Sequence, residues 1–388
     1  MKQVQVNELM PGDILGQPLF SPASAALLLK EGTVLTRERI NYLLAQGLDY
    51  QPAFILEEAT NALTTEEEKV LQDHFRLDVI KAVDNLDVQR TMVHSYQALS
   101  DIQNQVKEDK NVTLSMVEES SRQLVKEVLV NNDIMLQLAA LKSINEYTFG
   151  HSINVAIYAA HFAKMLGAPK QVMEKLALAG LLHDIGKMAV PTEILDKPDK
   201  LTRKEFEAVK WHAYESYQRL ATNKNIEDDV IKAVFQHHER LDGTGYLQGL
   251  KGKEIHPWAK VLAITDVYDA LTSRRCYRDA VLPHDTAEHL MALCSQGSLD
   301  RNLLISFLQN TPLFPLGAKV SLSTGETGTV VGHPQKLPLR PAVEVEEKQL
   351  SATGNTGSAL ESAPRAKKRI DLDECPTILI TGIEPPSV

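Results

Sequence analysis

The 388-residue sequence predicts a mainly α-helical protein whose helical body is flanked by small β-containing N- and C-terminal modules. Three observations support this fold class. Helix-forming residues are abundant, whereas aromatic residues make up only 5% of the chain. Apolar residues recur at helical spacing through residues 131–310. Short segments with alternating apolar and polar residues, which are typical of strands, occur near the ends of the chain.

The N-terminal module is expected to span residues 1–58. A turn at residues 11–13 precedes a short strand, and apolar residues on both sides of Glu31-Gly32 favour a hairpin. One short helix is predicted to begin at the capping residue Thr36 and to end at Gly47. The plainest interpretation of this segment is a small α/β module that binds protein partners.

Residues 59–130 are expected to form a helical linker. They contain neither Pro nor Gly, and their spaced Leu, Val and Ile residues predict amphipathic helices. The lone histidines of this segment, His74 and His94, are interpreted as surface or packing residues. Long helices of this kind could pair two copies of the chain into a homodimer.

The strongest helical signals lie in residues 131–311, where we predict the catalytic domain. The segment 151–167 has apolar residues at helical spacing and stops at Gly167. The segment 201–221 opens with Thr202 three residues before Glu205, the pattern of a capping box. Two further strongly apolar helices are predicted over 170–187 and 256–273.

The C-terminal module is expected to span residues 312–388 and to be rich in strands. Alternation in residues 316–333, with a turn at 324–328, predicts a β-hairpin. Further strands are predicted at 341–347 and 375–383. The small and then basic residues of about 351–368 indicate a flexible loop.

Bulk composition limits the function. A formal net charge of −10 argues against binding a nucleic acid polymer, which needs a basic surface. The three cysteines form no CxxC pair, which fits reduced thiols. We find neither a signal peptide nor the ~20 consecutive apolar residues of a membrane span. We therefore expect a cytoplasmic protein without a membrane span. The net charge does not exclude a small anionic ligand, because a few local cations or metal ions can hold it.

Histidine and carboxylate residues gather in the helical body, which holds nine of the twelve histidines. Imidazole nitrogens and carboxylate oxygens are the usual ligands of catalytic divalent metals. Seven such side chains exceed what one tetrahedral ion needs and suit two ions that share a bridging carboxylate and a bridging water. The candidate metal ligands are His151, at a helix start, with His183, Asp184, His212, His237, His238 and Asp266.

The spacing of these residues favours a shared site. Adjacent helical residues point ~100° apart, so the pairs His183-Asp184 and 237–238 can each reach toward two ions. Lys187 follows His183 by four residues and is expected on the same helix face, beside the metals. There it would hold a phosphate oxygen or hydrogen-bond the attacking hydroxide. Each residue alone has an ordinary structural explanation, and only their joint occurrence indicates chemistry. Four other histidines are interpreted as structural or surface residues: His161, which is the easiest to mistake for a ligand, His256, His284 and His289.

Three ordered motifs carry a resemblance to a known family. "LLHDIGK" at 181–187, "HHERLDGTGYL" at 237–247 and "AITDVYDALTSRRCYR" at 263–278 resemble the HD-GYP phosphodiesterases, a branch of the HD metal-hydrolase superfamily. The resemblance covers about 143–308. It implies an all-α domain with two or three metal ions, usually iron or manganese. It also implies signal transduction through a second messenger: cyclic di-GMP is hydrolysed by a metal-bridging hydroxide to linear pGpG and often GMP.

The resemblance also implies roles for individual residues. The seven candidate ligands match the family's ligand positions, with Asp184 bridging the ions and Lys187 beside them. Tyr246 matches the tyrosine of the GYP loop near the substrate, and that loop is shaped by Asp242, Gly243 and Gly245. Two basic residues that match phosphate-binding positions are Arg275 and Arg278.

Departures from the family pattern keep alternatives open. Leu247 replaces the proline of the GYP motif, and Cys276 replaces another proline. Tyr147 stands where members with a third metal carry Glu, so we expect two ions. A weakly active or inactive receptor for a cyclic dinucleotide, signalling through the flanking modules, is one alternative. Hydrolysis of another cyclic nucleotide is the other.

Overall fold

The structure is a computed structural model, and the described residues fall into many short ranges. They are 2–9, 14–21, 26–30, 33, 35, 37–48, 51–56, 63–81, 83, 85–144, 147–195, 197–273, 280–311, 314, 316–333, 340–346 and 367–384. Helices make up 57% of the described residues, which also form small N-terminal sheets and a C-terminal antiparallel sheet. This confirms the predicted fold class. The chain divides into two compact units, Met1–Glu68 and Lys69–Val388, which are described separately.

The first unit consists of small sheets and the helix α1. Its strands form a three-stranded antiparallel sheet in the order β1-β5-β2 and a separate pair of β3 and β4. The apolar core includes Leu15, Leu35 and Leu43. The helix is followed by Gly47, whose φ of 71° suits the end of a helix. The expected hairpin turn at Glu31-Gly32 lies outside the described residues. The elements are β1 (Lys2–Gln5), a 3-10 helix (Val6–Glu8), β2 (Ile14–Leu15), β3 (Leu19–Phe20), β4 (Leu27–Leu29), α1 (Arg37–Ala45) and β5 (Pro52–Leu56).

The second unit begins with amphipathic helices, as the spaced apolar residues predict. The longest of them, α4, begins at the cap residue Asn85, whose side chain accepts a hydrogen bond from the backbone N of Val88. Both α4 and α5 pack against α7, and α5 also packs against α8. Their buried faces therefore contribute to the core around the functional site. The helices are α2 (Thr65–His74), α3 (Leu77–Ile80), α4 (Leu86–Lys107), α5 (Ser115–Val130) and α6 (Asn132–Ala140).

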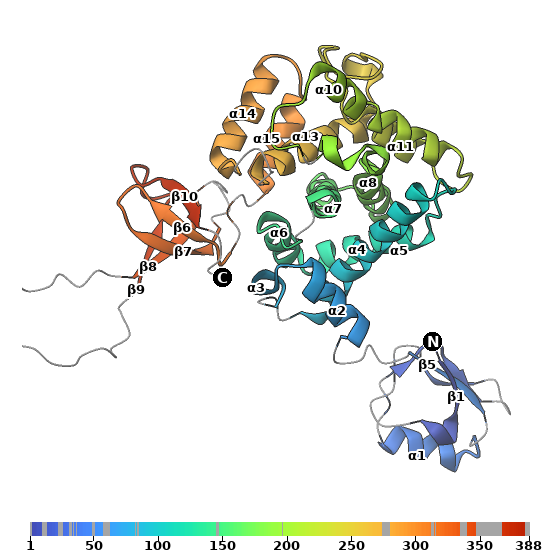
Figure 1. Cartoon of the computed structure of the whole chain (residues 1–388). Coiled ribbons are helices and arrows are strands. Elements are labelled where there is room, and N and C mark those ends of the chain that lie inside the picture. Colours follow the sequence, from blue (N-terminus) through green and yellow to red (C-terminus); the bar gives the residue numbers. More distant parts are fainter. Residues whose placement is uncertain are drawn as a thin grey trace, which may run out of the picture. The chain divides into compact units, whose positions relative to one another are not determined.

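Helix α7 (Tyr147–Met165) lies at the centre of the helical body, and Figure 1 shows it surrounded by other helices. It packs most extensively on α8 (Lys170–Leu182), and also on α4, α5, α6, α13 and α15. The closest approach is at Gly180, where a Cβ would lie 2.7 Å from Cα of Ala156. Glycine is therefore needed there to bring the two helices together.

Two of the predicted helices are interrupted. The segment 170–187 was predicted as one helix, but α8 ends at Leu182 and a 3-10 helix follows. The segment 201–221 breaks at Trp211 into two helices, although its capping box between Thr202 and Glu205 is confirmed. Ligand residues lie at both interruptions. The remaining elements are the 3-10 helix Ile185–Ala189, α9 (Thr192–Leu195), α10 (Arg203–Lys210), α11 (His212–Ala221), α12 (Asp228–Gln236), the 3-10 helix Gly252–Glu254, α13 (Pro257–Thr272), α14 (Pro283–Ser295) and α15 (Arg301–Asn310).

The C-terminal residues form a five-stranded antiparallel sheet in the order β10-β6-β7-β8-β9. The predicted hairpin is β6 with β7. Most of the expected loop lies outside the described residues, but its predicted end was wrong, because Lys367 and Lys368 belong to β9. Pairing with β8, including the ion pair of Lys367 with Glu344, outweighs the polar composition. The strands are β6 (Lys319–Leu322), β7 (Thr327–Gly332), β8 (Ala342–Glu346), β9 (Lys367–Asp371) and β10 (Ile380–Glu384).

Among the helices in the described ranges, none combines the length and the apolar character that crossing a bilayer requires.

Candidate metal centre

The seven predicted ligands lie together in the helical body. They come from α7, the end of α8, the start of α11, the end of α12 and α13. Six are buried, and His238 is 15% exposed. The ligand atoms form two groups, each with all atoms within 4.8 Å of one another. One group is Asp184, His212, His237 and His238, and the other is His151, His183 and Asp266.

The carboxylate of Asp184 faces both groups. Its Oδ1 lies 3.2 Å from Nε2 of His212, in the first group. Its Oδ2 lies 3.3 Å from Nε2 of His183 and 3.5 Å from Nε2 of His151, in the second group. One oxygen toward each group is the arrangement of a carboxylate that bridges two metal ions ~3.5–4 Å apart.

Asp266 also spans the two groups. Its Oδ1 lies 3.1 Å from Nε2 of His151, and its Oδ2 lies 3.8 Å from Nδ1 of His238. The two buried carboxylates supply two negative charges to a site that is otherwise made of imidazoles. That charge suits cations and would be costly to bury without them.

Backbone hydrogen bonds orient three of the histidines. Nδ1 of His183, His212 and His237 each donates to the backbone carbonyl three residues earlier, at 2.8, 2.6 and 2.6 Å. Each Nε2 therefore carries the lone pair and points into the site. Nε2 of His212 lies 3.4 Å from Nε2 of His237, although neither can donate to the other.

Buried atoms without partners give a test of metal fit. Nε2 of His183 and Oδ1 of Asp184 are buried and have no hydrogen-bond partner among the described residues. Buried polar atoms are normally satisfied, so a cluster of converging acceptors without a donor indicates a site for a cation. The residues present therefore fit two divalent ions.

The turn after α8 places Asp184. Oγ of Ser216, on α11, accepts from the backbone N of Gly186 at 2.9 Å and donates to the backbone O of His183 at 3.1 Å. A Cβ at Gly186 would overlap the backbone oxygen of His212. Glycine there allows α11 to pack on the turn, which brings His212 beside Asp184. The predicted helix over 170–187 was therefore wrong at its end, because this packing favours a 3-10 turn.

Helix ends add to the electrostatics. His183 and His237 are the C-cap residues of α8 and α12. The carbonyl end of a helix carries a partial negative charge, which stabilises a nearby cation. The prediction that His151 lies at a helix start was wrong. Helix α7 begins at Tyr147, and His151 is its fifth residue.

The protonation states of Asp184 and His237 match those of metal ligands. Burial opposes ionisation of Asp184, but the ammonium of Lys187 beside it helps to hold its pKa well below the usual range. Burial lowers the pKa of His237 to about 3. A carboxylate that stays ionised and an imidazole that stays neutral are the forms that bind metals.

His151 is held by residues that the sequence analysis missed. Its Nδ1 donates to Oδ2 of Asp269 at 2.8 Å, and Oδ1 of Asp269 accepts from Nζ of Lys142 at 2.6 Å. Burial disfavours the charged ring, but hydrogen bonds to Asp266 and Asp269 raise the pKa of His151 to about 9. A metal at Nε2 would displace that proton. The spacing of Asp269, one helical turn after Asp266, is the sequence signal that could have identified it.

The loop after α12 lies against the metal centre. The Tyr246 ring lies 4.6 Å from the His238 ring, centroid to centroid, and the Tyr246–Leu247 peptide is cis. The buried carboxylate of Glu239 accepts from the backbone N of Gln248 at 2.7 Å and of Leu250 at 2.9 Å. Glu239, which the sequence analysis also missed, therefore joins the start of the loop to the residues that follow Tyr246.

Asp242, Gly243 and Gly245 shape the same loop. Asp242 accepts from the backbone N of Thr244 at 2.8 Å. Gly243 has a φ of 81°, and a Cβ at Gly245 would overlap the backbone N of Arg240. The structural part of these three residues is to set the loop's path.

The remaining predicted residues divide into three sets. Nζ of Lys187 lies 2.5 Å from Oδ2 of Asp184, beside the metal groups as predicted. Arg275 and Arg278 lie outside the described residues. The four histidines interpreted as structural belong to neither metal group. Nε2 of His161, for example, donates to the backbone O of Asn310 at 3.0 Å and joins α7 to α15.

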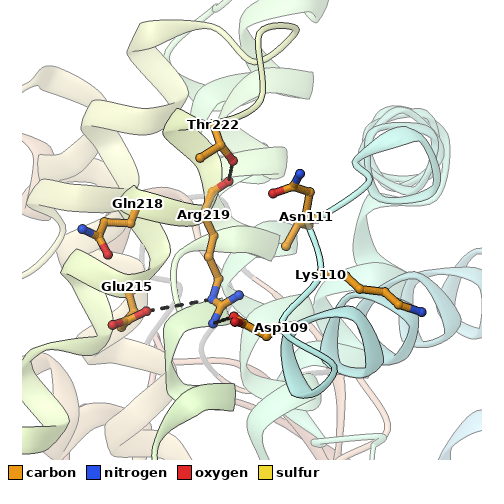
Figure 2. A pocket seen from close by; sticks show the side chains of 8 residues that line it. Asp109, Lys110, Asn111, Glu215, Gln218, Arg219 and Thr222 are labelled. Atoms are coloured by element: carbon orange, nitrogen blue, oxygen red, sulfur yellow. Dashed lines mark hydrogen bonds and ion pairs between the residues drawn. The ribbon is translucent and has the colours of Figure 1, made fainter.

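A pocket of about 220 Å³ lies at the other end of α11. Figure 2 shows Arg219 between Glu215 and the turn after α4, with Asp109 at 3.8 Å from the guanidinium. None of the seven candidate ligands lines this pocket. It is therefore separate from the metal centre.

Comparisons with known proteins agree with this geometry. Residues 125–303 match the HD domain family. The chain is 35% identical over 260 residues to cyclic di-GMP phosphodiesterase PA4108 of Pseudomonas aeruginosa, a match that covers 66% of this chain and 60% of that relative. It is 36% identical over 177 residues to 3'3'-cGAMP-specific phosphodiesterase 1 of Vibrio cholerae, covering 46% of this chain and 41% of the relative.

A solved structure is also similar. Bd1817, an HDG"Y"P protein from Bdellovibrio bacteriovorus, matches with a TM-score of 0.49 and 17% identity, over 79% of this chain and 97% of that one. The matched residues 125–303 resemble the HD domain family, and they include both buried groups of candidate metal ligands. More narrowly, this domain is homologous to the HD-GYP cyclic di-GMP phosphodiesterases, which confirms the resemblance carried by the three motifs.

Proposed function

We propose that the protein hydrolyses cyclic di-GMP to linear pGpG at a two-metal centre bridged by Asp184. The observation that carries this proposal is the position of the Asp184 carboxylate, with one oxygen toward each ligand group. Iron or manganese fits the mixed imidazole and carboxylate set. When bound, the two ions would supply an activated water and neutralise charge on the scissile phosphodiester.

The residues of the chain have distinct roles in this proposal. Asp184 and Asp266 hold both ions in place, while the five histidines complete the two ligand sets. Lys187 fixes the orientation of Asp184 and provides an ammonium for a non-bridging phosphate oxygen. Tyr246 forms a wall of the substrate site beside His238. Arg275 and Arg278 are proposed to hold substrate phosphate.

The choice between two cyclic dinucleotides rests on the relatives. The relative that matches 66% of this chain is named a cyclic di-GMP phosphodiesterase, which supports cyclic di-GMP. A relative that matches a smaller part is named a 3'3'-cGAMP-specific phosphodiesterase, which makes 3'3'-cGAMP the second candidate. Both candidates require the same metal centre.

A substrate comparison tests the proposal. Full-length protein is purified without oxygen, loaded with manganese or iron(II), and incubated with each dinucleotide separately while products are followed by chromatography. We expect pGpG to form with a kcat/KM at least ten times that for 3'3'-cGAMP. A higher kcat/KM for 3'3'-cGAMP than for cyclic di-GMP would make 3'3'-cGAMP the substrate instead. Stable binding without any product would support a receptor instead.

A further inference from the structure

Lys210 lies at the rim of the metal centre and has no part in the ligand set. It is the last residue of α10, two positions before the ligand His212. Its Nζ lies 5.5 Å from the centroid of the Tyr246 ring and 4.8 Å from that of Phe206. Because the Tyr246 ring lies against His238, a continuous row of side chains leads from the metal groups to the ammonium of Lys210.

We propose that Lys210 binds the second phosphate of the cyclic dinucleotide, the one that is not cleaved. This inference rests on the proposed function. A cyclic dinucleotide carries two phosphodiesters, and only one can lie on the metal ions. Lys187 is already held at Asp184, inside the centre. Lys210, whose Nζ lies beside the Tyr246 ring, is placed to neutralise the phosphate that remains.

The local contacts of Lys210 leave its ammonium available. Its side chain is 23% exposed, and its ionic partner is Glu207, at 3.0 Å and one helical turn away. Exposed ion pairs of this kind contribute little to stability, so the Glu207 carboxylate can give way to a phosphate. Before a phosphate binds, the aromatic faces of Phe206 and Tyr246 attract the Lys210 ammonium and hold it near the rim of the metal centre.

The helix that carries Lys210 is fixed at its other end. Thr202 and Glu205 form a capping box, and Glu205 also accepts from Nζ of Lys197 at 2.8 Å. Phe206 and Trp211, which flank Lys210 in the chain, are 47% and 54% exposed. Exposed aromatic faces beside a phosphate-binding cation are the combination that receives a nucleobase next to its phosphate.

Two substrates and three variants separate phosphate binding from a structural role. Metal-loaded wild type, Lys210→Met and Lys210→Arg are compared with Lys204→Met, a control on an exposed residue of the same helix. Cyclic di-GMP carries the second phosphate, and bis(p-nitrophenyl) phosphate does not. We expect Lys210→Met to raise the KM for cyclic di-GMP about 10- to 100-fold, as for the loss of a charge-assisted hydrogen bond.

The expected pattern across these proteins is specific. Lys210→Met should lower kcat/KM for cyclic di-GMP at least ten times more than kcat/KM for bis(p-nitrophenyl) phosphate. Lys210→Arg should recover most of the loss, and Lys204→Met should match wild type. Equal losses on both substrates, or no loss on cyclic di-GMP, would overturn the role of Lys210 alone. Wild type that cleaves bis(p-nitrophenyl) phosphate but no cyclic dinucleotide would overturn the proposed function and this inference with it.

Discussion

Nδ1 of His151 donates to Oδ2 of Asp269 across 2.8 Å, in the buried interior between α7 and α13. The other oxygen of Asp269 accepts from Lys142, whose backbone adopts the left-handed φ of 53° directly after α6. Non-glycine residues rarely adopt that conformation, so the packing around Lys142 must favour it. A chain of Lys142, Asp269 and His151 thus orients one metal ligand and keeps its second nitrogen directed at the site.

Replacing Asp269 with Asn should weaken metal binding about 10- to 100-fold, the usual effect of losing a carboxylate behind a ligand histidine. The amide keeps the size of the side chain but not its charge, which leaves the ammonium of Lys142 without compensation. Metal affinity is measured by competition with a chelator of known affinity. Asp285→Asn, at an exposed acid on α14, is the control. Unchanged affinity in Asp269→Asn would remove this residue from the metal centre.

Lys187→Met should reduce kcat about 100- to 1,000-fold, as expected when one preorganised donor to the reacting group is lost. The metal content should stay near that of wild type, because Lys187 is not a ligand. Both quantities are measured on the same preparation, by steady-state kinetics and elemental analysis. Lys175→Met, on the surface of α8, is the matched control. A fall in rate that only parallels a fall in metal content would show that Lys187 acts through Asp184 alone and would remove its proposed contact with the substrate phosphate.

Glu239→Gln should disturb the loop that carries Tyr246. The carboxylate accepts from two backbone N–H groups, and the amide can serve only one while its NH2 group faces the other donor. The loss of such a buried bond lowers the free energy of unfolding by ~1–3 kcal/mol. We expect a higher KM for cyclic di-GMP with metal content unchanged. A normal KM with normal stability would show that the loop does not depend on Glu239.

The pH dependence of stability should include a contribution from His161. Burial lowers its pKa to about 4, against 6.5 in the unfolded chain. The hydrogen bond from His161 to the backbone O of Asn310 opposes this lowering only in part. Between these two pKa values the unfolded state therefore binds more protons than the folded state. The contribution of His161 to stability is fully present above pH 6.5 and is lost as the pH falls toward 4.

The comparison of wild type with His161→Gln isolates this contribution, because the ligand histidines titrate in both proteins. The shift of about 2.5 pH units corresponds to roughly 3 kcal/mol of stability at most. Urea unfolding is measured from pH 7.5 to pH 4.5. The difference in unfolding free energy between the two proteins should shrink toward the acid end. A constant difference would contradict the lowered pKa.

The residues that gather at the candidate metal centre could be predicted from the sequence, because residue type nearly defines such a set. His183-Asp184 and the pair at 237–238 are chemically conspicuous, and their order along the chain carried the resemblance. Their supports could not be predicted. Asp269 and Lys142 are 127 residues apart, and only the fold brings them together. The fold class could be predicted from the periodicity of apolar residues. The same local pattern wrongly predicted that α8 continues through His183, where packing against α11 favours a 3-10 turn.

The central claim is that Asp184 bridges two ions that carry out hydrolysis. It is tested most directly by measuring bound metal and cyclic di-GMP turnover together in wild type and Asp184→Asn. We expect two ions per wild-type chain and formation of pGpG. In Asp184→Asn we expect at most one tightly bound ion and no detectable product. Two ions and a near-normal rate in Asp184→Asn would contradict a bridging role for this carboxylate.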